Sequence, residues 1–330
     1  MIELEKKHEL VTLAEGSGGQ EMDKLIHSFA FFNKVSNWKN SDNDSATYDL
    51  GNGKTLVFTT DSFTVDPLFF PGGNIGHLAM CGTINDLAVM GVTRPLGIST
   101  AFIIEEGLPK DNLEKITSSI DKISKETKIP IVTGDTKVVE KGKIERIMIT
   151  TSGIGMTDTL LTKKIEIGDK IIISGGIGEH AVALLSKRFD YKTNIVTDSK
   201  PLIDEITKIR HLIKIAKDPT RGGLSAALND ICAKNKVGML IDEESVPAKD
   251  EVRKVVDLLG INLYDLACEG RFVCVANKDN ADKIVDILKQ FNPDASIIGD
   301  ITNDNKVMIK TFLGSTILPP PTGRIIPRIC

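Results

Sequence analysis

Five aspartates in this 330-residue sequence stand at positions where side chains could act together in chemistry. Asp44, Asp61, Asp86, Asp135 and Asp218 each lie beside a predicted strand end, a glycine or a turn of small residues. No cluster of histidines accompanies them in the sequence. Ligand sets made only of oxygen suit Mg²⁺, which usually enters a site with the phosphates of a nucleotide. The set predicts a carboxylate cluster for Mg²⁺ and a nucleotide, although each aspartate alone is also typical of a turn or a helix cap.

The chain ends on a second reactive group, the thiol of Cys330. Pro319-Pro320-Pro321 and Pro327 favour an extended path for the last segment. An arm that starts at Gly314 has roughly 16 residues and a reach of up to roughly 50 Å. A thiol on such an arm could visit more than one active site. The alternative is a frayed terminus that happens to end in cysteine.

The composition restricts the class of protein. A hydrophobic fraction of 41% and a charged fraction of 26% are ordinary for a globular protein. A net charge of -4 offers no general electrostatic reason to bind nucleic acid. The first eight residues lack the apolar core of a signal peptide, and no apolar run is long enough to cross a bilayer. We therefore expect a cytoplasmic protein without a nucleic-acid or membrane partner.

The other four cysteines are scattered and form no C-x-x-C pair for zinc or redox chemistry. Cys81, Cys232 and Cys274 lie among apolar neighbours, which predicts buried thiols. Cys330 differs from them because a terminal residue is exposed, and exposure makes a thiol usable.

The length exceeds what one hydrophobic core usually holds, so two domains are expected. Thr157-Asp158 is the candidate boundary, which divides the chain into residues 1–157, residues 158–313 and a mobile tail of residues 314–330. Hydrophobic periodicity predicts an α+β mixture in both halves. The predicted helices are 20–32, 74–90, 109–128, 179–187, 201–217, 249–259 and 280–291, with one more that starts near Pro219 and is capped by Asp218. The predicted strands are 45–50, 55–60, 94–104, 129–132, 144–156, 170–174, 237–242, 271–276, 295–298 and 306–311.

Two local patterns each leave alternatives open. Asn85-Asp86 interrupts an apolar helix, so the pair should face a metal, a ligand or a cap, or else mark an exposed helical side. The glycine segments 16–19 and 175–178 each open a helix. Such segments cradle phosphate in some proteins and only permit close packing in others.

Six segments together resemble the aminoimidazole-ribonucleotide synthetase superfamily, which includes selenophosphate synthetase and thiamine-phosphate kinase. They are residues 16–19 (GSGG), 43–46 (NDSA), 60–62 (TDS), 82–91 (GTINDLAVMG), 134–137 (GDTK) and 218–223 (DPTRGG). The resemblance implies a two-domain α+β fold. Its amino-terminal domain would pair its sheet with that of a second subunit in a homodimeric barrel, its carboxy-terminal domain would be α/β, and an extended tail would follow. ATP would bind in a cleft formed largely by the amino-terminal domain. The superfamily usually has two adjacent aspartates where this chain has Asn43-Asp44.

The terminal Pro327-Arg328-Ile329-Cys330 is similar to the tail of the superfamily's hydrogenase-maturation carbamoyl dehydratases. That similarity implies that the carbamoyltransferase HypF loads a carbamoyl group onto Cys330. ATP-dependent dehydration would turn this group into a thiocyanate, and the cyano group would pass to a HypC–HypD complex for the iron of a [NiFe] hydrogenase.

The resemblance also implies roles for single residues. ATP would be bound by Asp44, Asp61, Asn85, Asp86, Gly134, Asp135 and Asp218, and Mg²⁺ by Asp44, Asp61, Asp135 and Asp218. The base is a proposal from the chemistry and not from the resemblance: closing a nitrile needs a base near the carbamoyl nitrogen of the Cys330 adduct. Glu269 is the candidate, because Gly270 beside it allows close approach of another backbone, and Lys137 and Asp86 would assist it. An exposed turn glutamate and a solvated lysine are the plain alternatives for Glu269 and Lys137.

Two other functions compete with this one. A synthetase similar to selenophosphate synthetase would usually carry a reactive cysteine or selenocysteine in its amino-terminal glycine segment, and residues 15–20 have none. The other competitor is a carrier or scaffold whose tail thiol docks to a partner without catalysis. ATP turnover that depends on a carbamoylated tail would separate an enzyme from a carrier.

Overall fold

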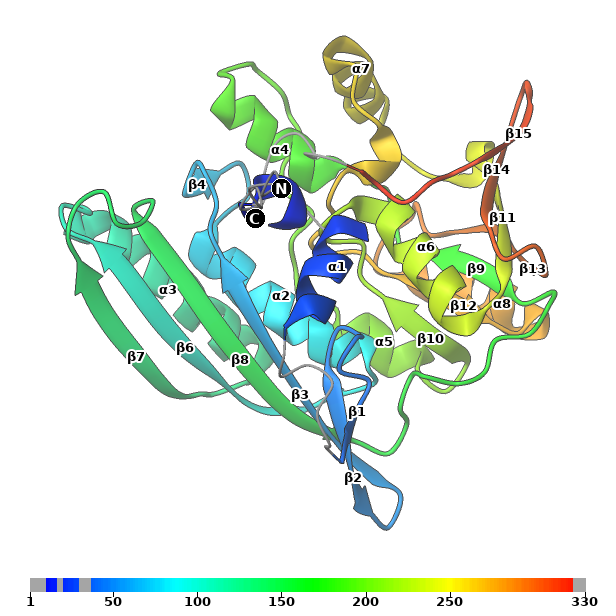
Figure 1. Cartoon of the computed structure of the whole chain (residues 1–330), viewed down its shortest axis with the longest axis horizontal. Helices are drawn as coiled ribbons and strands as arrows, with labels where there is room; N and C mark the ends of the chain where they lie inside the picture. Colours follow the sequence, from blue (N-terminus) through cyan, green and yellow to red (C-terminus); the bar gives the residue numbers. More distant parts are fainter. Residues whose placement is uncertain (1–9, 17–19, 30–36, 323–330) are drawn as a thin grey trace, which may run out of the picture.

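The chain forms two α+β halves that pack against each other (Figure 1). A computed structural model describes residues 10–16, 20–29 and 37–322. Cys330 and most of the first glycine segment lie outside the described residues. Within the described ranges, no helix combines the length and the apolar character needed to cross a membrane.

The amino-terminal half is built on a six-stranded sheet in the order β1-β2-β3-β8-β6-β7. The strands are β1 (Trp38–Lys39), β2 (Ala46–Gly51), β3 (Lys54–Phe63), β6 (Pro95–Glu105), β7 (Ile131–Val139) and β8 (Ile147–Thr157). Only β6 and β7 are parallel, because helix α3 (Lys110–Thr127) carries the chain back between them. A short α1 (Gln20–Ser28) precedes the sheet, and β4 (Phe69–Phe70) pairs with β5 (Gly73–Asn74) beside it.

Helix α2 (Ile75–Val89) is the central element of the fold. It is apolar on every side, and all of its fifteen residues are buried except His77 and Asp86, which are half-buried. A helix of this kind has to be covered all round. One side packs on β3 and β8, and another side meets α3 and elements of the carboxy-terminal half. The Asn74 side chain accepts hydrogen bonds from the first free backbone N–H groups and fixes where α2 begins.

The carboxy-terminal half has a seven-stranded sheet in the order β10-β12-β9-β13-β11-β14-β15. The strands are β9 (Lys170–Ile173), β10 (Ile213–Lys217), β11 (Gly238–Asp242), β12 (Val273–Ala276), β13 (Ser296–Thr302), β14 (Val307–Thr311) and β15 (Gly314–Ile317). The helices are α4 (Glu179–Arg188), α5 (Ile203–Ile209), α6 (Gly223–Asn235), α7 (Asp250–Leu259) and α8 (Lys278–Leu288). All pairs are antiparallel except β11 with β14. The predicted two-domain α+β fold is confirmed.

Four local predictions differ from the structure. Residues 213–217, predicted as helix, form strand β10. Helix α6 begins at Gly223 with Gly222 as its N-cap, so Asp218 is not a cap. Residues 134–137, predicted to follow a strand, lie inside β7. Residues 314–317, predicted to start the tail, form β15 and pair with β14.

Candidate active site

Carboxylates from both halves converge on one small cavity of about 40 Å³. Asp61 comes from β3, Asp86 from α2, Asp218 from the end of β10 and Glu269 from the loop before β12. Arg221 also lines the cavity. The volume is enough for an ion or a very few waters. Four predicted site residues therefore meet at a cavity between the two halves.

Burial and mutual repulsion raise the pKa values of these carboxyl groups. Burial raises the pKa of Asp218 to about 8, with Asp44 and Asp61 adding to the shift. Burial also raises the pKa of Asp61, although Arg221 and a hydrogen bond with Asp86 act against the increase. The pKa of Asp86 lies well above its usual range because of burial and the nearby Asp61, Asp218 and Asp44. A cation in the cavity would relieve this repulsion.

Asp44 stands at the rim of the cluster. Its carboxylate forms an ion pair with Lys217, which is itself 3.2 Å from Asp230. The Thr59 hydroxyl lies 3.0 Å from the Asp44 carbonyl and donates to the Asp86 carboxylate at 2.7 Å. Asp44 is thus tied to the cluster by backbone and side chain, while Lys217 offsets its charge.

Asn85 has a structural role in this cluster. Its amide nitrogen donates to the carbonyls of Lys200 and Glu269, each at 3.0 Å, and its oxygen accepts from the N–H of Leu202 at 2.9 Å. Both amide hydrogens are used, so the predicted contact of Asn85 with ATP has no free donor. The side chain instead joins α2 to two loops of the carboxy-terminal half.

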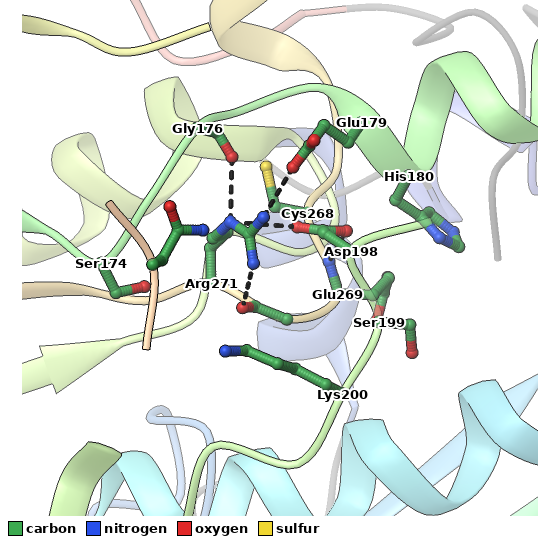
Figure 2. A network of polar contacts seen from close by, with 12 residues as sticks. Ser174, Gly176, Glu179, His180, Asp198, Ser199, Lys200, Cys268, Glu269 and Arg271 are labelled. Carbon is green, nitrogen blue, oxygen red and sulfur yellow. Dashed lines mark hydrogen bonds and ion pairs between the residues drawn. The ribbon is translucent and has the colours of Figure 1, made fainter. Parts of the chain in front are cut away.

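Glu269 is held from its other side by Asp198. The Asp198 carboxylate accepts the Glu269 backbone N–H at 3.1 Å (Figure 2). Position 270 must be glycine, because a Cβ there would overlap the carbonyl oxygen of Asp198. The backbone of Glu269 is therefore fixed through both its N–H and its C=O. Its side chain lines the cavity and is 3% exposed.

The Glu269 carboxyl group has an unusually high pKa. Burial is the main cause, and Asp218, Asp198 and Asp61 raise the pKa further, whereas Arg221 lowers it. A carboxylate with such a pKa is a stronger base than an exposed one once it has lost its proton. The plain alternative, an exposed turn glutamate, does not fit this burial.

A buried Arg271 supports the loop behind Glu269 (Figure 2). Its guanidinium donates to the carbonyls of Gly176 and Gly270 at 3.0 Å and pairs with Glu179 at 2.6 Å and Asp198 at 3.8 Å. The glycine turn 175–178 is therefore used to bind Arg271. Of its two predicted roles, the structure supports close packing and not a phosphate cradle.

Gly134, Asp135 and Lys137 do not reach the cluster within one chain. Asp135 lies in register with Ala101, Thr150 and Ser62 across β6, β8 and β3. That separation is three strand spacings, about 14 Å. The hydroxyls of Ser62 and Thr150 bond to each other on the exposed face of the sheet, opposite to Asp61. Gly134 packs under the Thr100 carbonyl, which leaves no room for a Cβ.

The sequence analysis missed four residues of this region: Thr59, Lys217, Asp198 and Arg271. Lys217 directly precedes Asp218 in the sequence, so a lysine charge beside this carboxylate could have been predicted. Asp198 and Arg271 had no local signal, because their partners lie up to 95 positions away. Arg221 was noticed only as part of a motif.

Metal binding is not preformed in the described ranges. No three His, Cys, Asp or Glu side chains among residues 10–16, 20–29 and 37–322 are arranged as a metal-ligand set. The carboxyl groups of Asp61, Asp86 and Asp218 nevertheless supply oxygen donors around one cavity, where burial and the neighbouring carboxyl groups raise the pKa of each. These donors fit Mg²⁺ in chemistry, if they shift slightly on binding.

The four cysteines that the structure describes are all free and buried. Burial raises the pKa of the Cys81 thiol to about 12 and also raises those of Cys232, Cys268 and Cys274. They stay protonated near neutral pH and are poor nucleophiles. The predicted burial of Cys81, Cys232 and Cys274 is confirmed.

Comparison with known proteins assigns the chain to a family. Residues 42–157 match the family "AIR synthase related protein, N-terminal domain", and residues 166–310 match its C-terminal domain. The carbamoyl dehydratase HypE of Rhizobium leguminosarum bv. viciae is 40% identical over 97% of this chain and 95% of its own length. The chain is thus an AIR-synthase-related protein.

Two similar solved structures show which branch of the family the chain belongs to. A HypE in complex with HypF is 41% identical, with a TM-score of 0.83 over 92% of this chain and 100% of that chain. A HypE in complex with ATP is 34% identical, with a TM-score of 0.80 over 97% of this chain and 100% of that chain. The chain belongs to the HypE family.

Proposed function

We propose that this protein is an ATP-dependent carbamoyl dehydratase that converts an S-carbamoyl group on Cys330 to a thiocyanate. The observation that carries the proposal is the cavity where Asp61, Asp86, Asp218 and Glu269 meet in a member of the HypE family. The similarity to a HypE with bound ATP supports the choice of nucleotide. A selenophosphate-synthetase-like activity is not favoured, because the relatives named above are HypE proteins.

Mg²⁺ is part of the proposal. Asp61, Asp86 and Asp218 would hold it, and Asp44 at the rim would join them if its pair with Lys217 opens. When bound, the ion would neutralise charge on the ATP phosphates. Arg221, 3.6 Å from Asp61, is our candidate for a contact with the phosphate oxygens.

The reaction needs a better leaving group than the amide oxygen. Transfer of the ATP γ-phosphoryl group to the carbamoyl oxygen lets that oxygen leave as inorganic phosphate. The carbamoyl nitrogen gives up both of its protons, and the carbon–nitrogen triple bond forms. Glu269 is our candidate for the group that accepts a proton from nitrogen, because its buried carboxyl faces the cavity on a fixed backbone.

Cys330 is the candidate acceptor for the carbamoyl group. The four other thiols are buried with raised pKa values, so none of them is available to a modifying protein. HypF is the candidate donor protein, since a HypE of 41% identity is known in complex with HypF. The HypC–HypD complex remains the proposed acceptor of the cyano group, and the need for ATP and a free thiol suggests the cytoplasm as the location.

We also propose a homodimer formed through the exposed face of the amino-terminal sheet. Trp38, Tyr48, Leu56 and Met156 pair in sequence across four strands and form an apolar row on that face. A contiguous apolar surface of this kind marks interaction sites. Asp135 and Lys137 share that exposed face, so their predicted roles would be exercised toward the second subunit.

The test is the intact mass of the protein after incubation with a carbamoyl donor system, before and after Mg²⁺ and ATP are added. We expect a carbamoyl adduct first, and then the loss of one water from it only when ATP is present. Cys330→Ala should fold normally and form neither adduct. An adduct that persists in Cys330→Ala, or a carbamoyl group that stays unchanged with ATP, would contradict the proposal.

A further inference from the structure

The hairpin of β14 and β15 carries the most exposed pair of apolar side chains in the described chain. Phe312 and Leu313 form its tip and are 91% and 92% exposed. The hairpin projects from the rim of the carboxy-terminal half (Figure 1). Large apolar side chains at a projecting tip stay in contact with water, so they do not stabilise the fold of their own chain.

An apolar strip continues from this tip across the sheet. Leu240 of β11 is paired with Met308 of β14, and Met308 is paired with Ile317 of β15. Directly paired residues share one face of a sheet. Leu240 and Ile317 are exposed and Met308 is half-buried, so this face is open. Its other face is closed, because Val307 and Ile309 of β14 are buried.

β15 is also an open edge. It is the last strand of the sheet, all four of its residues are exposed, and its sequence is Gly-Ser-Thr-Ile. Soluble proteins usually protect an edge strand with charges, proline or a bulge. β15 has no charge and no proline, so it can accept an additional strand.

The position of the hairpin relative to the tail indicates what binds it. β15 runs directly into Leu318, which is buried, donates to the Val307 carbonyl at 2.8 Å and accepts from Asn229 at 3.0 Å. Cys330 follows Leu318 by 12 residues. Its sulfur can therefore travel at most about 40 Å from Leu318. A protein that reacts with Cys330 therefore has to come within about 40 Å of the base of this hairpin, which makes the exposed hairpin a candidate contact for it.

We infer that the β14–β15 hairpin and its strip form the docking surface for the protein that carbamoylates Cys330. The inference rests on the proposed function, and it adds where that partner binds. The partner presents an apolar socket for Phe312 and Leu313 and an extended segment that pairs with the free edge of β15. Lys310 of β14 and Lys306 just before β14 are exposed, so acidic residues around the socket would complement them.

The test compares matched surface variants with HypF as the probe. The double variant Phe312→Ser/Leu313→Ser removes the tip, and Ile317→Lys places a charge on the strip. Leu258→Ser is the control, because Leu258 is 83% exposed on α7, outside the β14–β15 hairpin. All three change exposed residues, so folding should be unaffected.

We expect the first two variants to lower the initial rate of Cys330 carbamoylation at least 10-fold at HypF concentrations below saturation, with Leu258→Ser unchanged. A wild-type sample carbamoylated in advance and then freed of HypF should be dehydrated at the same rate as each variant treated in the same way. Binding of ATP should also be equal.

Three outcomes are decisive. If HypF carbamoylates both hairpin variants at the wild-type rate, the inference is wrong while the proposed function stands. If HypF does not carbamoylate the wild-type protein at all, the proposed function is wrong. If the hairpin variants lose self-association in size-exclusion chromatography but keep their carbamoylation rate, the surface binds a second copy and the inference is again wrong.

Discussion

Glu269 combines a fixed backbone with a carboxyl group that makes no hydrogen bond to residues 10–16, 20–29 or 37–322. Its N–H and C=O bind Asp198 and Asn85, and its carboxyl group lines the cavity. A base has to be held within reach of the proton it removes, and this arrangement fixes its position without using its oxygens.

Glu269→Gln should slow dehydration of the carbamoyl group by roughly 100-fold or more, because the amide keeps the shape of the side chain but cannot accept the proton. Tail carbamoylation and ATP binding should be unchanged. Single-turnover mass spectrometry measures the rate, and Glu244→Gln on the surface is the control. A wild-type rate in Glu269→Gln would move the role of base to Asp86 or to water.

Asp218→Asn should affect stability and ligand binding in opposite directions. Removing one of several repelling carboxyl groups should raise the melting temperature of the protein without ligand. The increase should grow from about pH 4 and be complete above about pH 8, the pKa of Asp218 in the fold. The same change removes a proposed oxygen ligand, so the increase in melting temperature caused by Mg²⁺ and ATP should largely disappear.

Thermal melts at pH 8.5 with and without Mg²⁺ and ATP test this, with exposed Asp304→Asn as the control. An undiminished response to Mg²⁺ and ATP would remove Asp218 from the metal site.

At the scale of single residues, the sequence indicated the carboxylates that line the cavity but not the residues that hold them in place. Asp61, Asp86, Asp218 and Glu269 could be singled out because acidic residues at strand ends and turns are chemically conspicuous. The roles of Asn85 and Asp198 could not be predicted in the same way. Their contacts to Glu269 span 184 and 71 positions, and no local pattern encodes a contact of that length.

Among the elements, α2 does the most to join the two halves. Asn85 is a buried polar residue on a largely apolar helix. Its three hydrogen bonds go to loops of the carboxy-terminal half. A buried polar group that is fully bonded fixes one arrangement of its neighbours.

Asn85→Ala should lower the free energy of unfolding by about 2–4 kcal/mol, since it leaves two carbonyls and one N–H buried without partners. It should also slow dehydration with Glu269 intact. Urea unfolding measures the first effect, and Asn194→Ala, an exposed asparagine, is the control. If stability and rate are both unchanged, α2 does not position Glu269 through Asn85.

The elements that the sequence mispredicted share a physical cause. Residues 213–217 contain three buried apolar side chains and two lysines, a short pattern that suits a strand or a helix turn. Pairing with β12 decides between them. Residues 314–317 were predicted to start the tail, because their sequence has no strand pattern of its own. They form β15 by pairing with β14. Long periodic segments such as α2 and α3 need no such help and were predicted to within one or two residues.

For the whole molecule, the proposed dimer is tested by its apolar row. Met156→Lys should convert a dimer to a monomer, because a charge in a paired sheet face has to be desolvated. Light scattering coupled to size-exclusion chromatography measures the mass. Leu259→Lys on α7 is the control. If the wild-type protein is already a monomer at micromolar concentration, Asp135 and Lys137 lose their proposed roles.

The contact between the halves should also be sensitive to acid. His180 of α4 is fully buried against Phe70 and bonded to Thr197, and burial lowers its pKa to about 3, with nearby His77 acting in the same direction. The unfolded chain binds a proton near pH 6.5 and the folded one does not. The contribution of neutral His180 to the folding stability is therefore fully present above pH 6.5 and is lost as the pH drops toward 3.

From pH 7 to pH 5 this single histidine should cost about 2 kcal/mol of stability. His180→Gln should reduce the difference between urea unfolding free energies at the two pH values by that amount, whereas exposed His211→Gln should not. An equal difference in wild type and His180→Gln would show that another group causes the acid sensitivity.

The anchoring of Leu318 turns the terminal thiol into a tethered substrate. Leu318 bonds to Asn229, six residues into α6, and the residues just before α6 line the cavity. The cavity thus lies well inside the roughly 40 Å that Cys330 can travel. One thiol within a sphere of that radius has an average concentration of several millimolar, whatever the dilution of the protein. Conversion of a loaded tail should therefore be first order in protein, and a free peptide of the same sequence would have to reach millimolar concentration to compete.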